Sequence, residues 1–215
     1  MTTVANSTKR RGRPRASDLQ QRSHDLLDVA EMALVELGYE GVTLNLIAKR
    51  ASVSKRTIYA KYGDKKGLLE AVLKRMSVGT FGPELSAEDD LPFLDGLRWR
   101  AERVLRNNLR PGAIAIAAIA IRESKRFPEF LVTMLEAKRM YQQDPLRLYF
   151  ERFKDRGIIG DVDCVALASM FLWMLSEDMI NTVATGVAAG DSDDIITAKA
   201  ELVANMLAGT LLRMD

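Results

Sequence analysis

The chain has 215 residues, 47% hydrophobic and 28% charged, which is the composition of an ordinary globular protein long enough to bury a core. Its longest purely apolar run, residues 113–121, is too short to span a membrane, and its polar, basic N-terminus argues against a signal peptide, so we expect a soluble cytoplasmic protein. The net charge of the whole chain is only +2, but the charge is distributed unevenly: residues 1–75 carry 15 Lys and Arg against 8 Asp and Glu (net +7), and residues 76–215 carry 16 against 21 (net −5). This asymmetry predicts a DNA-binding module joined to a second, acidic domain.

Residues 1–16 are predicted to form a flexible basic arm. The run Lys9–Arg15, KRRGRPR, contains glycine and proline, which disfavour a helix and leave an extended chain. This pattern resembles an AT-hook, in which Arg11, Arg13 and Arg15 would enter the narrow minor groove of A·T-rich DNA. A solvated basic tail is the alternative interpretation.

A helix is predicted over Ser17–Leu37, ending at Gly38, and residues 43–65 then carry the pattern of two short helices joined by a tight turn. Thr43 and Ser54 are the expected N-caps, because a hydroxyl there accepts from free N–H groups of the first turn. In the second helix Ile58 is the apolar anchor. The polar side faces outward, as insertion into the major groove requires.

The position of each polar residue along this second helix determines which part of the DNA its side chain can contact, and so predicts its role. Lys55 and Arg56, in the first turn, are expected at base edges. Phosphate contacts are expected from Thr43, Thr57, Tyr59, Lys61 and, at the start of the following helix, Lys65. That following helix is predicted over Asp64–Val78, with a break at 79–83, and we expect it to be the only rigid link between the two domains.

The remainder of the chain is predicted to be helical. The expected helices are Pro92–Leu109, a segment at 113–121 buried on all sides, 129–157 with a kink or a new helix at Asp144–Pro145, and then 163–186 and 194–212. The last two are too apolar for a surface pair. Packed against the same pair of a second copy, they would form a four-helix bundle and hence a homodimer.

Residues 25–75 closely resemble the DNA-binding domain of the TetR family of transcriptional regulators. The matching marks include Leu37-Gly38-Tyr39, Ser52-Val53-Ser54 and Thr57-Ile58-Tyr59, and residues 122–130 resemble a segment of the family's C-terminal domains. Ala60 stands where the family usually has a large aromatic residue, and Tyr62 stands where it usually has Phe, a change that preserves the packing. The resemblance implies contact with double-stranded DNA at an inverted repeat, through Thr43, Ser54, Lys55, Arg56, Thr57, Tyr59, Lys61 and Lys65.

The expected fold is therefore all-α, with a three-helix helix-turn-helix domain at 17–78 and a helical ligand-binding and dimerisation domain at 84–215. We expect no enzyme, because phosphate-binding loops, cysteine pairs and histidine triads are missing from the sequence. The one histidine, His24, has no second ligand at metal-binding spacing. No metal or cofactor is therefore predicted.

A set of mostly apolar and aromatic residues is predicted to line a small-molecule site in the second domain. The candidates are Trp99, Ile114, Met134, Tyr141, Trp173, Met174 and Glu177. For most of them plain core is the alternative, and for Glu177 it is the wet edge of the dimer bundle. Two functions follow: a repressor released from its operator by an apolar ligand, or a DNA-organising or partner-binding protein with no ligand.

Overall fold

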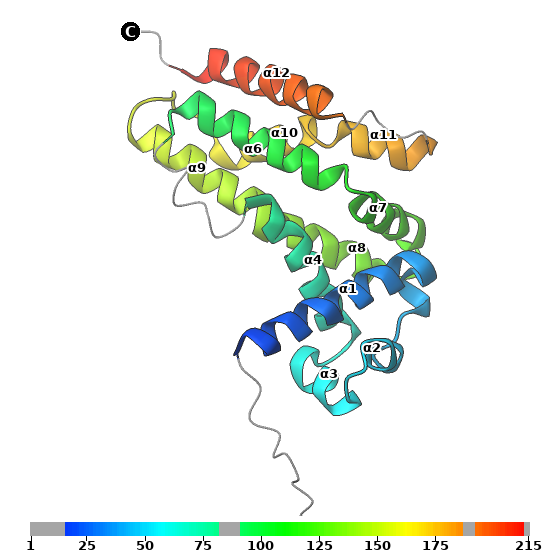
Figure 1. The fold of residues 1–215 in the computed structure, drawn as a ribbon. Helices are drawn as coiled ribbons and strands as arrows, with labels where there is room; N and C mark the ends of the chain where they lie inside the picture. The colour runs from blue at the N-terminus through cyan, green and yellow to red at the C-terminus, as the bar shows by residue number, and fades with distance from the viewer. Residues whose placement is uncertain (1–15, 82–90, 187–191, 213–215) are drawn as a thin grey trace, which may run out of the picture.

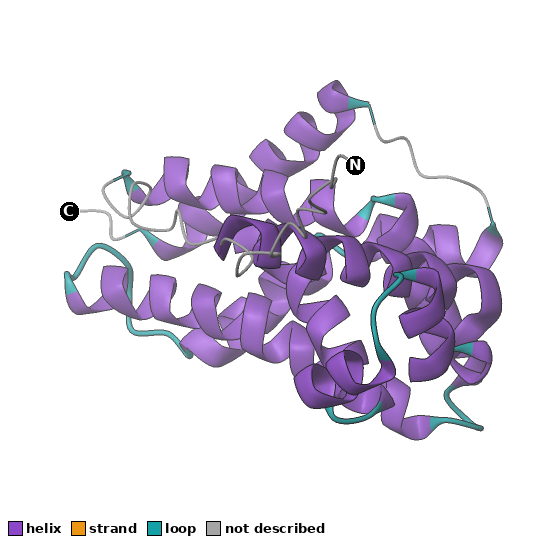
Figure 2. Ribbon diagram, turned by 60° about the horizontal axis from the view of Figure 1, so that its bottom comes forward, coloured by secondary structure: helices purple, strands orange, loops and turns teal. Residues whose placement is uncertain are grey.

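The computed structural model describes residues 16–81, 91–186 and 192–212, and within these ranges its regular secondary structure is helical, apart from one isolated bridge between Ile159 and Leu212. The expected all-α fold is confirmed (Figures 1 and 2). The predicted arm, residues 1–16, lies outside the described residues except for Ala16. None of the helices in the described ranges combines the length and apolar character that a membrane crossing requires. The helices are α1 Ala16–Gly41, α2 Leu44–Arg50, α3 Lys55–Tyr62, α4 Lys65–Phe81, α6 Phe93–Asn108, α7 Pro111–Glu123, α8 Pro128–Lys138, the π-helical turn η1 Arg139–Gln143, α9 Asp144–Asp155, α10 Cys164–Met174, α11 Glu177–Thr185 and α12 Asp193–Leu211.

We call α1 to α4 the head and α6 to α12 the body. The head occupies one end of the molecule, and α4 leads from it into the body, where it packs against α6 and α8 (Figure 1). Helices α6, α9, α10 and α12 form the far end, with α12 lying along α6.

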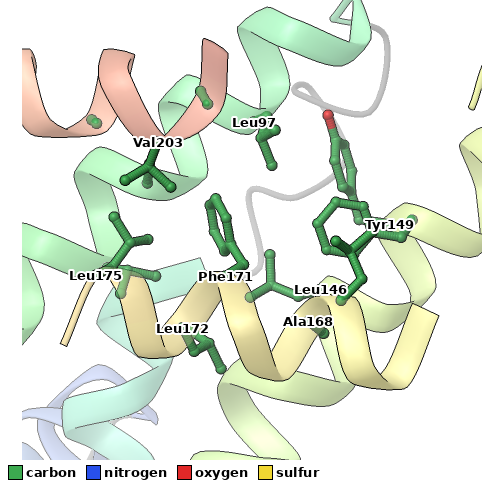
Figure 3. Packing of buried hydrophobic residues seen from close by; sticks show 14 of the residues in the cluster. Leu97, Leu146, Tyr149, Ala168, Phe171, Leu172, Leu175 and Val203 are labelled. Atoms are coloured by element: carbon green, nitrogen blue, oxygen red, sulfur yellow. The ribbon is translucent and has the colours of Figure 1, made fainter. Parts of the chain in front are cut away.

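The body has its own core, built where α6, α9, α10 and α12 meet. Leu97, Leu146, Phe150 and Phe171 are all completely buried there, and Figure 3 shows Phe171 lying among side chains from the neighbouring helices. The Tyr149 hydroxyl donates a hydrogen bond of 2.6 Å to the carbonyl of Phe93, so this phenol is buried without an unpaired donor.

A second core joins the head to the body. Besides apolar residues of α1 to α4 such as Ile47 and Ile58, it includes Ile116 and Ile119 of α7 and Phe130 of α8. Residues on both sides of the predicted domain boundary at 79–90 therefore share one apolar core. The limits 17–78 and 84–215 stay a prediction.

Three details of the predicted helices are corrected. Helix α4 continues to Phe81, three residues beyond its predicted end at Val78 and into the predicted break. The segment 113–121 is not buried on all sides: Ile116 and Ile119 are buried, whereas Ile121 is 53% exposed, because one side of α7 faces solvent.

The third correction is that residues 163–186 form two helices, α10 and α11, separated at Leu175 and Ser176. The buried Ser176 hydroxyl donates to the carbonyl of Leu172 at 2.6 Å, and the Asn108 side chain donates to the same hydroxyl at 3.3 Å. These side-chain bonds lie where the regular helix is interrupted.

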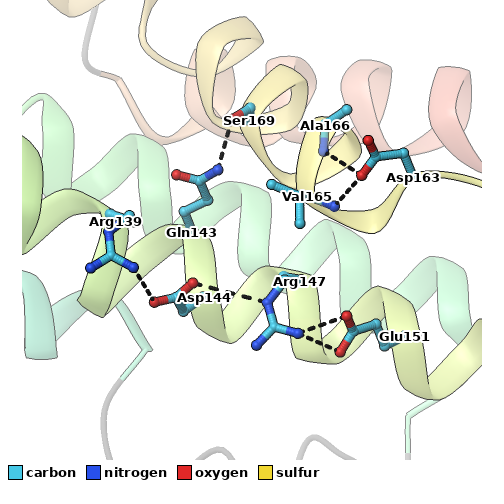
Figure 4. Close-up of polar contacts among 9 residues, drawn as sticks. All are labelled: Arg139, Gln143, Asp144, Arg147, Glu151, Asp163, Val165, Ala166 and Ser169. Atoms are coloured by element: carbon cyan, nitrogen blue, oxygen red, sulfur yellow. Dashed lines mark hydrogen bonds and ion pairs between the residues drawn. The ribbon is translucent and has the colours of Figure 1, made fainter.

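Pro145 explains the helix irregularity between α8 and α9. Proline has no N–H and its ring clashes with the carbonyl four residues earlier, here that of Tyr141. The chain responds with the π turn η1, in which the Asp144 N–H reaches back to the Arg139 carbonyl. Gln143 then donates to Ser169 of α10 at 2.8 Å, which ties η1 to the body (Figure 4). Of the two predicted alternatives, a new helix beginning at Asp144 is confirmed.

Candidate nucleic-acid interface and effector site

Both predicted N-caps are confirmed. The Thr43 hydroxyl accepts from the N–H of Leu46 at 3.1 Å, and the Ser54 hydroxyl accepts from the N–H of Thr57 at 3.0 Å. Ser52, in the turn between α2 and α3, has a positive φ of 54°, and a short polar side chain tolerates this region better than a branched one. The caps and the turn together fix the angle at which α3 leaves α2.

Helix α3 separates a buried side from an exposed side. Ile58 is completely buried in the head and anchors the helix. Its opposite side carries two basic residues in the first turn and one in the last, with hydroxyl groups between them. The exposed residues predicted to bind DNA are Thr43, Ser54, Lys55, Arg56, Thr57, Tyr59 and Lys61.

Lys65 lies differently from the other predicted DNA contacts. Its ammonium is 4.0 Å from the centre of the Tyr39 ring and donates to the Glu40 carbonyl at 3.4 Å. Burial lowers the pKa of Lys65, and the nearby carboxylates of Glu123, Glu129 and Glu40 act in the opposite direction. Lys65 therefore rests against the end of α1, beside the body, and its role as a phosphate contact stays a prediction.

Removing the N-cap of α3 is expected to destabilise the head. Ser54→Ala removes the side-chain acceptor of the Thr57 N–H, which costs about 1 kcal/mol of unfolding free energy. Chemical denaturation at fixed protein concentration measures this loss. Ser124→Ala, which removes a hydroxyl that bonds back to the carbonyl of Ile121 at the end of its own helix, is the control and should change stability by less than about 0.5 kcal/mol. Equal stability of Ser54→Ala and the wild type would contradict the capping role.

The head and the body meet in a second place besides α4. The N–H of Tyr39, at the end of α1, donates to the Glu123 carboxylate at 3.1 Å, and its ring stacks on Phe130 at 4.8 Å between centres. Arg126 forms a two-pronged ion pair with Glu40. The prediction that the fourth helix is the only rigid link is therefore wrong, because the corner between α7 and α8 folds back onto α1.

The residues predicted to line a ligand site are distributed over several surroundings. Trp99 and Met174 are partly buried against the body core, whereas Met134 and Tyr141 pack against the core shared with the head. Ile114 is partly buried on α7. Trp173 is 65% exposed, and Glu177 is an exposed residue 3.9 Å from the Lys199 ammonium. The seven therefore do not line a common pocket.

The surface hollows formed by the described residues include three with defined linings. Two of them, of about 170 and 380 Å³, lie side by side where α4 meets α8 and η1, and Tyr141 lines both. The third, of about 410 Å³, lies between the end of α9 and the start of α10 and includes Cys164. The other six predicted ligand residues line none of the three. Among the described residues, no group of three His, Cys, Asp or Glu side chains could hold a metal ion.

Two family descriptions match the chain. Residues 26–72 match "Bacterial regulatory proteins, tetR family", and residues 95–209 match "AefR-like transcriptional repressor, C-terminal domain". Over 52 residues the chain is 42% identical to YvkB of Bacillus subtilis (strain 168), described as an uncharacterized HTH-type transcriptional regulator. The matched stretch covers 24% of this chain and 28% of the length of that relative.

Solved structures share the fold over most of the chain. A regulator assigned to the TetR family from Mesorhizobium loti MAFF303099 matches with a TM-score of 0.70 at 19% identity, covering 90% of this chain and 98% of that one. The fatty acid degradation regulator FadR from Bacillus halodurans gives 0.66 at 19% identity, over 87% and 95%. FadR from Bacillus subtilis, solved with stearoyl-CoA, gives 0.64 at 17% identity, over 87% and 98%.

Proposed function

The chain belongs to the TetR family of transcriptional regulators, and on this premise we propose that it is a homodimeric repressor that a small molecule releases from an inverted-repeat operator. Members of this family are transcription factors, not enzymes. The observation that carries the proposal is the capped helix α3, anchored by the buried Ile58, with Lys55 and Arg56 exposed at its first turn. Acting on the chromosome, the protein would work in the cytoplasm.

Dimer formation is supported by apolar side chains that α10 and α12 leave exposed. On α10, Val165, Met170 and Trp173 are exposed, and on α12, Leu202 and Met206 are exposed. Exposed large apolar side chains on both segments support an interaction surface there. A two-fold dimer through residues 163–186 and 194–212 would place two copies of α3 at the two halves of an inverted repeat.

In the DNA complex we assign base recognition to Lys55 and Arg56, and phosphate contacts to Thr43, Thr57, Tyr59, Lys61 and Lys65. Ser54, the N-cap of α3, would lie beside the DNA at the same end of the helix as Lys55 and Arg56. The basic arm, with Arg11, Arg13 and Arg15, would add minor-groove contacts.

Release by a small molecule is supported by the two links between head and body, α4 and the contact of Tyr39 with Glu123. Two heads can bind successive major grooves of one operator only if their recognition helices lie about 34–36 Å apart. A ligand that favours another distance between the two helices therefore releases DNA. The apolar character of this ligand stays a prediction. The scattering of the seven predicted lining residues favours the second candidate, a DNA-organising or partner-binding protein without a ligand.

Selection from random DNA with two variants tests the proposed function. Arg56→Ala should change which bases are preferred, because Arg56 would bond base edges, at a cost of about 1–3 kcal/mol of binding free energy. Lys65→Ala should weaken all sequences alike. Arg156→Ala, which removes an exposed positive charge at the end of α9, is the control and should leave selection unchanged. Enriched sites without two-fold symmetry, or no enrichment at all, would contradict the proposal.

A further inference from the structure

We propose that the groove between α4 and the α8–η1 segment, next to the last turn of α3, is an effector site for a small aromatic monocarboxylate. The proposal rests on the proposed function, because it names a site and a ligand class through which this regulator would be controlled. The groove consists of the two adjoining pockets of about 170 and 380 Å³, which share Glu70 and Tyr141. Together they have the size of small-ligand sites in proteins.

The larger pocket has its floor on one face of α4. Gly67, Glu70, Ala71 and Lys74 recur at the i, i+3, i+4, i+7 spacing of a single helix stripe, and all four line this pocket. The two small residues leave the hollow between the longer side chains. Gly67 is also required by the turn before α4, because a Cβ there would overlap the carbonyl oxygen of Tyr62.

The smaller pocket has its floor on α8 and η1. Thr133, Glu136, Ala137 and Met140 form a stripe with the same spacing, again with a small residue inside it. Tyr141 follows in the π turn imposed by Pro145 and lies where the smaller and the larger pocket adjoin. Because Gln143 holds this turn to α10 through Ser169, the position of Tyr141 is fixed by the body (Figure 4). Widened turns of this kind occur frequently at functional sites.

Two lysines line the larger pocket, Lys61 of α3 and Lys74 of α4, and Lys74 is the one that lies beside Tyr141. The Lys74 ammonium lies 5.9 Å from the centre of the Tyr141 ring, and no carboxylate of the described residues lies within 4.0 Å of it. A carboxylate placed here would accept a charge-assisted hydrogen bond from the Lys74 ammonium.

The remaining lining selects the rest of the ligand. Tyr141, Ala71, Ala137 and Met140 offer an aromatic ring and apolar surface, against which a planar aromatic body can stack. Glu70 of α4 and Glu136 of α8 both line the smaller pocket. A second negative charge on the ligand would face one of these carboxylates, so a monocarboxylate is favoured over a dicarboxylate.

The position of the groove gives its occupant a direct effect on the head. Lys61 and Tyr62 form the last turn of the recognition helix α3, whereas Tyr141 belongs to the body. A ligand that touches both sides would favour one orientation of α3 relative to the body. Operator affinity and ligand affinity would then change by the same factor, because the coupling is reciprocal.

Titration calorimetry of the full-length protein without DNA tests the site, with 2-naphthoate as the probe. We expect saturable binding of one molecule per protomer, weakened at least about tenfold by Lys74→Gln. The uncharged 2-naphthamide should bind the wild type as weakly as 2-naphthoate binds the variant. Lys125→Gln, an equal charge change at the exposed corner between α7 and α8, is the matched control and should have no effect.

Ala71→Leu provides an independent variant, since it fills the floor of the larger pocket while Lys74 stays in place. We expect it to abolish 2-naphthoate binding without lowering the melting temperature. No saturable binding to the wild type, or equal binding by the wild type and Lys74→Gln, would overturn the proposed site. Operator binding that is intact without any 2-naphthoate binding rejects the groove alone, whereas 2-naphthoate binding without any operator binding rejects the proposed repressor. Binding of both with no mutual effect would overturn the effector role.

Discussion

Operator affinity should fall by about 10³–10⁵-fold when the salt concentration rises from about 50 to 200 mM, if a dimer neutralises roughly 6–10 phosphates. The expectation follows from the exposed side of the helix-turn-helix unit. Lys55, Arg56 and Lys61 are exposed on α3, and Thr43 lies at the start of α2, so each head presents several phosphate-binding groups. Each contact releases counterions, and the logarithm of the affinity falls by about 0.9 per phosphate for each tenfold rise in salt.

Lys61→Ala makes this expectation specific to one contact. The variant should reduce the salt slope by about 0.9 for each head, and hence by about twice that for a dimer. Fluorescence anisotropy at several salt concentrations, with the operator obtained by selection, measures the slope. Arg156→Ala, at the far end of the body, should leave it unchanged. A slope near zero for the wild type would mean that phosphate contacts do not dominate binding, and the assignment of α3 to the DNA interface would fail with it.

The largest loss of stability is expected from Phe150→Ala. Phe150 is completely buried where α6, α9 and α10 meet, and its ring lies 6.2 Å from that of Phe171 and 5.6 Å from that of Tyr149, centre to centre. Truncation removes the transfer free energy of the ring and leaves a cavity that the surrounding helices fill only in part. The expected cost is about 3–5 kcal/mol of unfolding free energy.

Leu148→Ala is the matched control on the same helix. Leu148 is 56% exposed in the protomer, so truncating it to alanine should lower the unfolding free energy by less than about 0.5 kcal/mol. Both variants are compared with the wild type by denaturant unfolding at one protomer concentration, because dimer formation makes apparent stability depend on concentration. A loss for Phe150→Ala no larger than for Leu148→Ala would contradict the described body core.

Much of the head could be predicted from sequence because its structure is encoded locally. A hydroxyl at Thr43 or Ser54 caps the helix that begins at the next residue, so each cap depends on neighbours within three positions. The buried Ile58 and the exposed Arg56 follow from the 3.6-residue period alone. The new helix at Asp144 likewise follows from Pro145, since the missing N–H acts on the turn immediately before it.

The body was predicted less well because its details depend on contacts distant in sequence. The break between α10 and α11 lies at Ser176, where Asn108, 68 positions earlier, donates to the serine hydroxyl. Ile121 is apolar, so its side chain gives no sign in the sequence that it lies on the uncovered side of α7. Similarly, nothing near Tyr39 in the sequence indicates that Glu123 and Phe130 pack against it.

The helical periods, the caps and the basic face of α3 could be read from the sequence, because these features depend on residues within one or two turns of each other. Which helix faces meet became clear from the packed structure. The stripes containing Ala71 and Ala137 both have helical spacing, yet periodicity defines the face of a single helix and not its partner. The groove arises because α8 and η1 pack along α4 and place Tyr141 beside Lys74, and long-range packing of this kind follows from the burial of all the helices together.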